Sequence, residues 1–130
     1  MAYAGRCECG GVAFVVDGPL RGVVACHCRQ CRRTSGHFSA YTSALRADVR
    51  FERDEGLAWY GSSSTAERGF CRHCGSTLFW RRLADTERMS IAAGSLEGAT
   101  GLEIERHIFT ADRGDYYRIP SDEIQHQAWT

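Results

Sequence analysis

The spacing of its seven cysteines constrains this chain more than any other feature. The cysteines stand in three short groups, at residues 7–9, 26–31 and 71–74. Cysteines two or three positions apart place two thiolates on one turn, where both can bind the same metal ion. An odd number of cysteines also leaves one thiol over in any complete disulfide pairing. The spacing therefore predicts metal sites and not disulfides.

Seven sulfurs divide into one group of four and one group of three. Zinc prefers four tetrahedral ligands, so two close pairs that meet in space form a closed, structural site. The predicted ligands of this structural zinc are Cys7, Cys9, Cys71 and Cys74. The middle group offers three sulfurs on one loop, which suits an open site with one exchangeable position. The predicted ligands of this catalytic zinc are Cys26, Cys28 and Cys31, giving two zinc ions per chain.

Two other interpretations of the cysteines stay open at this stage. Cys71 and Cys74 have the spacing of a thioredoxin-like redox pair, although the βαβ pattern expected around such a pair is missing. A zinc ribbon that binds nucleic acid would also use close cysteine pairs. However, sixteen basic residues balance sixteen acidic ones, which gives no excess positive charge for phosphates. We therefore expect no nucleic-acid partner.

The chain also has none of the sequence features of a membrane or secreted protein. No apolar run approaches the roughly 20 residues that cross a bilayer. The first residues lack the charged and apolar regions of a signal peptide. We expect a cytoplasmic protein with no membrane partner, in a reducing compartment where cysteines stay free to bind metal.

Short strand patterns dominate the rest of the sequence. Runs rich in β-branched and aromatic residues, separated by turn residues, predict strands at 12–16, 22–25, 38–41, 49–52, 57–60, 77–81, 89–93 and 107–110. Helical periodicity is weak, and we expect only single helical turns at 43–45 and 121–124. A length of 130 residues suits one core. The sequence thus predicts an all-β fold in a single zinc-binding domain, residues 1–130.

The cysteine groups and their neighbours resemble the family of glutathione-dependent formaldehyde-activating enzymes and the related centromere-protein-V-like proteins. The matching stretches are 7–14 (CECGGVAF), 26–36 (CHCRQCRRTSG) and 70–78 (FCRHCGSTL), with softer matches at 94–97 (GSLE), 107–109 (HIF) and 116–117 (YY). The resemblance implies small antiparallel sheets packed around zinc, a β-tent. It also implies a carbon–sulfur lyase-type enzyme that acts on an adduct of glutathione, or another thiol, with formaldehyde or a similar small aldehyde. The alternative is a non-catalytic zinc module that binds a protein or a small molecule.

Several side chains near the middle cysteine group are candidates for further roles. Arg29, Arg32 and Arg33 could offset the negative charge of three thiolates, and we expect Arg32 and Arg33 to bind a substrate carboxylate. His27 and His37 could move a proton, and His27 could instead close the site as a fourth ligand. The aromatic residues at 59–60 and 79–80 could line a pocket, but we expect them in the core, where alternating aromatic residues of short strands usually pack. Exposed strand edges make a homodimer plausible.

Overall fold

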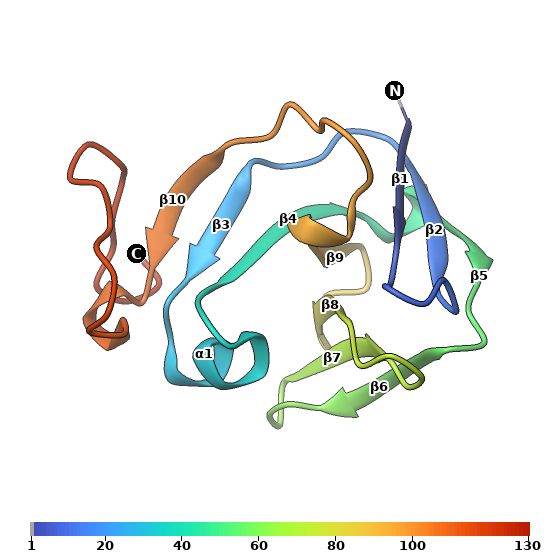
Figure 1. Cartoon of the computed structure of the whole chain (residues 1–130), viewed down its shortest axis with the longest axis horizontal. Helices are drawn as coiled ribbons and strands as arrows, with labels where there is room; N and C mark the ends of the chain where they lie inside the picture. The colour runs from blue at the N-terminus through green and yellow to red at the C-terminus, as the bar shows by residue number, and fades with distance from the viewer. Residues whose placement is uncertain (1) are drawn as a thin grey trace.

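Two β-sheets and one short α-helix make up residues 2–130, the part of the chain that this computed structural model describes (Figure 1). The strands are β1 (Ala2–Arg6), β2 (Ala13–Asp17), β3 (Val23–Cys26), β4 (Ser39–Leu45), β5 (Val49–Arg53), β6 (Leu57–Gly61), β7 (Ala66–Cys71), β8 (Thr77–Arg82), β9 (Arg88–Ala92) and β10 (Ile104–Ile108). The helix is α1 (Arg29–Ser35), and single 3-10 turns are η1 (Arg46–Asp48), η2 (Ala93–Ser95) and η3 (Thr110–Asp112).

The smaller sheet has the order β1-β2-β5, and the larger sheet has the order β10-β3-β4-β9-β8-β7-β6. Figure 1 shows the larger sheet curving from β10 round to β6, with the smaller sheet beyond β4 and β9. Neighbouring strands are antiparallel in both sheets, with the exception of β3 and β10, which run parallel. The predicted mainly β class of small sheets is confirmed.

The core lies between the two sheets because the inward residues of each are apolar. Phe14 of β2 packs on Phe79 of β8 with ring centroids 5.1 Å apart, and Ile91 of β9 is buried in the same cluster. Cys7 and Cys71 belong to this cluster as well. One cysteine group therefore sits at the margin of the core, where burial and metal binding can support each other.

The alternation of side chains along the strands places a polar row on the other face of the larger sheet. Arg68 lies opposite Trp80 in the β7–β8 register, and Trp80 lies opposite Ser90 in the β8–β9 register. Further along the sheet, Ser39 of β4 lies opposite Cys26 of β3. The same strands thus present apolar residues to the core and polar residues to the middle cysteine group.

The predicted strands all occur, and the differences have local causes. The predicted helical turn at 43–45 is wrong, because β4 continues through Ala44, which is fully buried and paired with β9. The predicted turn of helix at 121–124 is a non-helical turn. The last strand ends at Ile108 and not at residue 110, because Phe109 adopts a φ of 54°. The strands β1 and β7 and the helix α1 were not predicted.

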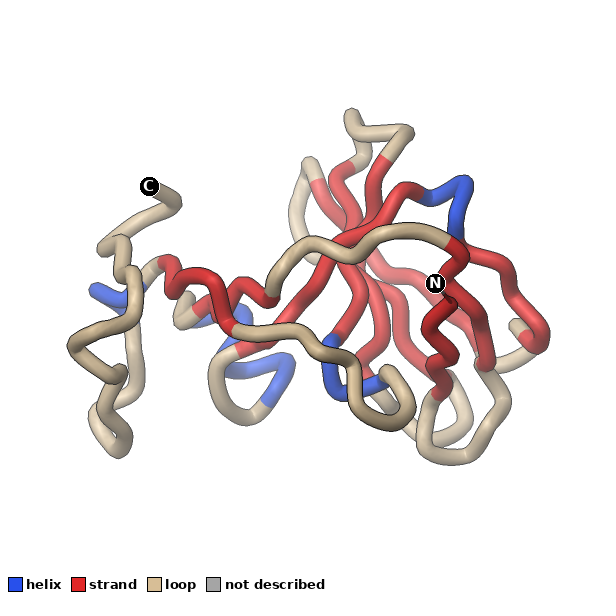
Figure 2. The backbone as a smooth tube through the Cα atoms, turned by 90° about the horizontal axis from the view of Figure 1, so that it is seen from above, coloured by secondary structure: helices blue, strands red, loops and turns tan. Residues whose placement is uncertain are grey.

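The segment after β10 folds back along that strand. Backbone hydrogen bonds join His107 N–H to the Ile124 carbonyl and Phe109 N–H to the Ala128 carbonyl. Figure 2 shows this C-terminal segment at the end of the molecule remote from the N-terminus. It brings Tyr117 to His27 and Trp129 to the wall of the cavity beside the middle cysteine group. Across residues 2–130, none of the helices has the length and apolar character that a bilayer crossing requires.

Candidate metal centres

The outer cysteines converge from two turns that are far apart in the sequence. Cys7 and Cys9 occupy the turn between β1 and β2, while Cys71 ends β7 and Cys74 lies in the turn before β8. Their four sulfur atoms all lie within 4.8 Å of one another. Gly75 has a φ of 78°, a left-handed conformation that a glycine adopts at little cost. It lets the second turn close tightly, with its N–H bonded to the Cys71 carbonyl at 2.7 Å.

The sulfur spacing fits a tetrahedral zinc site. The Cys9 sulfur lies 3.7 Å from the sulfurs of Cys7 and of Cys71. A tetrahedron with zinc–sulfur bonds of about 2.3 Å has edges of about 3.8 Å. Backbone N–H groups also point at the sulfurs: Val12 donates to Cys7 at 3.2 Å, and Gly11 donates to Cys9 at 3.4 Å. Such donors stabilise thiolates, which are the form that zinc binds.

Ser76 connects the two cysteine turns. Its Oγ accepts a hydrogen bond from the Glu8 N–H at 3.0 Å and lies 3.1 Å from the Cys74 sulfur, to which it can donate its proton. The hydrogen bond from Ser76 lowers the pKa of Cys74 to about 5. Ser76 therefore fixes the relative position of the turns and favours the thiolate of Cys74.

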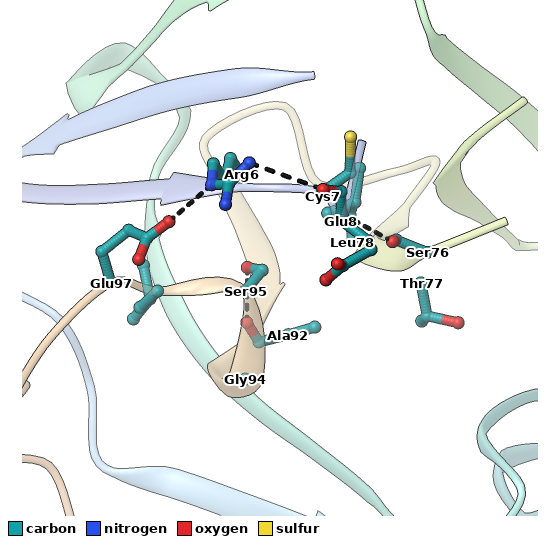
Figure 3. A pocket seen from close by; sticks show the side chains of 11 residues that line it. Arg6, Cys7, Glu8, Ser76, Thr77, Leu78, Ala92, Gly94, Ser95 and Glu97 are labelled. Atoms are coloured by element: carbon teal, nitrogen blue, oxygen red, sulfur yellow. Dashed lines mark hydrogen bonds and ion pairs between the residues drawn. The ribbon is translucent and has the colours of Figure 1, made fainter. Parts of the chain in front are cut away.

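A polar hollow of about 460 Å³ adjoins this cluster (Figure 3). Arg6 and Glu97 form an ion pair across it at 2.8 Å. The stretch from Gly94 to Glu97, one of the softer matches to the family, joins β1 here: Glu97 N–H bonds to the Ala4 carbonyl at 2.8 Å, and Leu96 enters the core. Since Arg6 pairs with Glu97 and Glu97 N–H bonds to β1, we interpret this hollow as the junction between β1 and the 94–97 segment.

The middle cysteines gather at the junction of β3 and α1. Cys26 ends β3, Cys28 immediately precedes α1, and Cys31 is buried in the first turn of the helix. Their three sulfurs lie within 4.8 Å of one another. The Cys28 sulfur accepts the Cys31 N–H at 3.3 Å, which fixes the loop. Within residues 2–130, no other His, Cys, Asp or Glu ligand atom joins this group.

The three sulfurs strongly affect one another's ionisation. Hydrogen bonds from Cys26 and Cys28 lower the pKa of Cys31, while the same contacts raise the pKa of Cys26. One negative charge is thus favoured in the cluster and a second is opposed, so a cation is needed to hold three thiolates. Arg68 supplies part of that charge, because its Nη2 lies 3.6 Å from the Cys31 sulfur.

A cavity of about 410 Å³ opens beside the three cysteines. Its lining combines the polar row of the larger sheet with residues from the loops and the C-terminal segment: Arg21, Val24, Cys26, Cys28, Gln30, Cys31, Ser39, Tyr41, Arg68, Trp80, Arg82, Ser90, Ile108, Phe109 and Trp129. Three arginines and no Asp or Glu line it, counting residues 2–130. Burial lowers the pKa of Arg21, which marks a partly desolvated cation. The cavity therefore favours an anionic ligand with some apolar surface.

His27 is fully buried and its ring is engaged away from the cysteine sulfurs. His107 donates from Nε2 to the Glu123 carboxylate at 2.9 Å, so its Nδ1 accepts from His27 Nε2 at 2.9 Å. The Nδ1 of His27 then accepts the hydroxyl proton of Tyr117. Burial lowers the pKa of His27 to about 4, so its ring is neutral near pH 7. This chain of hydrogen bonds fixes the loop that carries Cys26 and Cys28.

The other predicted residues lie outside the cavity lining. Arg32 and Arg33 are on α1, the first half-buried and the second exposed, and Arg29 is exposed at the start of that helix. His37 accepts or donates a hydrogen bond at Tyr116, 2.7 Å away. The roles of Arg21, Arg68 and Arg82 were not predicted: Arg68 and Arg82 lie on β7 and β8, far from residues 26–31 in the sequence, and Arg21 precedes β3 outside the cysteine motif. Trp80, predicted in the core, instead lines the cavity, and Tyr60 is largely exposed.

Comparison with known protein families matches residues 2–112 to the glutathione-dependent formaldehyde-activating enzymes. The chain belongs to this family. A Schizosaccharomyces pombe protein named as an uncharacterized lyase is 29% identical over 118 residues, covering 88% of this chain and 83% of that protein. A crystal structure of a Rhodobacter sphaeroides protein, a structural-genomics target, is 30% identical with a TM-score of 0.62 and covers 77% of this chain and 91% of that one. The chain is thus an enzyme of the glutathione-dependent formaldehyde-activating type, a carbon–sulfur lyase in class.

Proposed function

We propose that this chain is a zinc enzyme that forms and cleaves the adduct between glutathione, or a similar thiol, and formaldehyde or a related small aldehyde. Cys7, Cys9, Cys71 and Cys74 would hold a structural zinc, and Cys26, Cys28 and Cys31 would hold a catalytic one. The observation that carries the proposal is the incomplete three-sulfur cluster at the wall of an arginine-lined cavity. Zinc bound there would favour the thiolate form of an incoming sulfur.

The reaction balances without any redox partner. The thiol sulfur uses an electron pair to form a bond to the carbonyl carbon, and the carbon–oxygen π pair moves to the oxygen. The proton that the thiol loses ends on that oxygen, giving a hydroxymethyl thioether from a thiol and formaldehyde. The cavity contributes by holding both reactants beside the three cysteines, where proximity accelerates the step. Cleavage of the adduct is the reverse.

The arginines support a thiol that carries carboxylates. Arg82 forms no side-chain hydrogen bond or ion pair within residues 2–130, and Arg21 is anchored by the Tyr41 carbonyl at 2.9 Å. Arginine binds carboxylates with paired, charge-assisted hydrogen bonds. A role for Arg32 and Arg33 in the same task stays a prediction, since neither lines the cavity.

Exchange NMR tests the reaction directly. Glutathione, formaldehyde and their adduct exchange spontaneously, and the enzyme is expected to raise the exchange rate in proportion to its concentration. Cys28→Ser should abolish this increase. An exchange rate equal to the spontaneous one with fully zinc-loaded protein would overturn the proposal.

The choice of thiol is tested with Arg82→Gln. Losing one charge-assisted hydrogen bond should raise the KM for glutathione about tenfold, whereas the KM for 2-mercaptoethanol, which has no carboxylate, should stay the same. Arg50→Gln, at an exposed arginine on β5, is the matched control. An equal change in the KM values for glutathione and for 2-mercaptoethanol would refute carboxylate recognition by Arg82.

The alternative, a non-catalytic zinc module, has no need for an open coordination position. His27 is the nearest candidate to close the three-cysteine site, but both of its ring nitrogens are bonded elsewhere. This arrangement favours the enzyme over the module.

A further inference from the structure

We infer that Arg68 and Ser39 form a subsite for the aldehyde-derived oxygen of the adduct, which makes them catalytic residues of the proposed reaction. The inference rests on the proposed function and adds to it the groups that receive the developing negative charge. It begins from two buried polar atoms that have no nitrogen or oxygen partner.

The Nε of Arg68 and the Oγ of Ser39 are both buried, and within residues 2–130 neither has a nitrogen or oxygen partner; the Ser39 hydroxyl contacts only the Cys31 sulfur. Arg68 is 4% exposed and Ser39 is 3% exposed, and both line the cavity beside the cysteines. Buried polar groups are almost always paired, because an unpaired one loses its hydration without compensation. Two such atoms on one cavity wall indicate a ligand that pairs with them.

The position of Arg68 is set by its other nitrogens. Its Nη2 lies 3.0 Å from the Gln30 amide oxygen and 3.6 Å from the Cys31 sulfur, and its Nη1 lies 3.5 Å from the Tyr41 hydroxyl. These contacts hold the guanidinium against the cysteine cluster and leave the Nε–H free to donate. A preorganised donor of this kind is most effective where charge develops during a reaction.

Ser39 approaches the cluster from β4. It pairs with Cys26 across β3 and β4, so both side chains lie on the same face of the sheet. Arg68 contacts Cys31, and Ser39 lies beside both Cys26 and Cys31, so the two donors border the same sulfur cluster. The ligand atom that reaches them is therefore close to the reacting sulfur.

The chemistry of the adduct identifies that atom. In the hydroxymethyl thioether, the oxygen is bonded to the same carbon as the sulfur, and it carries the negative charge once the carbon–oxygen π pair has moved. The carboxylates of the thiol lie farther from its sulfur and suit Arg21 and Arg82. Arg68 and Ser39 thus donate hydrogen bonds to the oxygen while the carbon–sulfur bond forms or breaks, and the oxygen then takes the proton that the thiol has lost.

Two variants test this subsite: Ser39→Ala and Arg68→Lys. Arg68→Lys keeps the positive charge beside Cys31 but removes the Nε–H donor. We expect both variants to lower the maximal exchange rate about a hundredfold to a thousandfold, with the Kd for glutathione alone within about twofold of the wild type and the zinc content unchanged. Ser43→Ala, at another buried serine of β4 that does not line the cavity, is the control.

A binding measurement provides a second readout that needs no turnover. S-(carboxymethyl)glutathione carries an oxyanion near the adduct oxygen, whereas S-methylglutathione has none. The wild type should bind the first at least fivefold more tightly, and Ser39→Ala and Arg68→Lys should lose that preference while Arg82→Gln keeps it. A preference unchanged in both variants would overturn the subsite. If the wild type shows the preference, both variants lose it and exchange is not accelerated, the proposed function and the catalytic role fail, and Arg68 and Ser39 form an oxyanion-binding site only.

Discussion

Cys9→Ser isolates the stabilising effect of the four-cysteine centre, because Cys9 is exposed and its replacement buries no hydroxyl group. A metal shared by Cys9 and Cys71 cross-links positions 62 residues apart. The chain-entropy relation for cross-links gives about 4 kcal/mol for a loop of that length. For Cys28→Ser, the same relation gives about 2 kcal/mol, because Cys26 and Cys31 are only five positions apart. Against a total stability of about 5–15 kcal/mol, the first loss is severe and the second is tolerable.

Urea unfolding of the two variants and the wild type, each prepared with added zinc, measures these differences. We expect Cys9→Ser to lower the free energy of unfolding by about 2 kcal/mol more than Cys28→Ser, for the reason above. Removing metal with a chelator should bring wild type and Cys9→Ser to the same stability, since the cross-link is then absent from both. Equal destabilisation by the two variants, or a Cys9→Ser effect that survives the chelator, would refute the division into a structural and a catalytic centre.

Three further predictions follow from single side chains. Ser76→Ala should speed the transfer of zinc from the four-cysteine centre to a chelator about tenfold, because the link between its two turns is lost; an unchanged transfer rate would count against that role. Glu123→Gln should speed zinc loss from the three-cysteine centre by a similar factor and leave the other centre unaffected, since Glu123 orients His27 through His107. Phe79→Ala should lower the free energy of unfolding by about 3–5 kcal/mol, because it leaves a cavity in the core. Trp80→Ala, on the opposite face of the sheet, should lower it less than half as much and raise the KM for glutathione. Similar decreases in Tm for the two variants would contradict the assignment of faces.

Close cysteine pairs could be predicted from the sequence because a single turn brings each pair together. The joining of residues 7–9 with 71–74, 62 positions apart, was predicted from the preference of zinc for four ligands and not from nearness in the sequence. Arg68 and Ser39 could not be predicted, since only the pairing of β7 with β8 and of β3 with β4 brings them beside the cysteines. Arg32 and Arg33 were chosen for their nearness in sequence; they lie on α1 outside the cavity lining, and their binding of a substrate carboxylate stays a prediction.

The elements of the fold also differ in how far the sequence predicts them. Strands with alternating apolar residues were predictable, whereas α1 was too short for a helical period to appear and depends on the Cys28 sulfur at its start. Residue type alone does not predict the position of Trp80: a tryptophan is expected in the core, and only the register of β8 places it on the polar face. The single domain over residues 1–130, the cytoplasmic location and a homodimer stay predictions.

Native mass spectrometry of freshly reduced protein, with and without glutathione, tests the central claim most directly. The account predicts two zinc ions per chain and a bound glutathione that disappears in Cys28→Ser but persists in Cys9→Ser. The same spectra report whether the chain forms a dimer. One tightly held zinc, unaffected by glutathione, would contradict the claim that the three cysteines form an open metal centre.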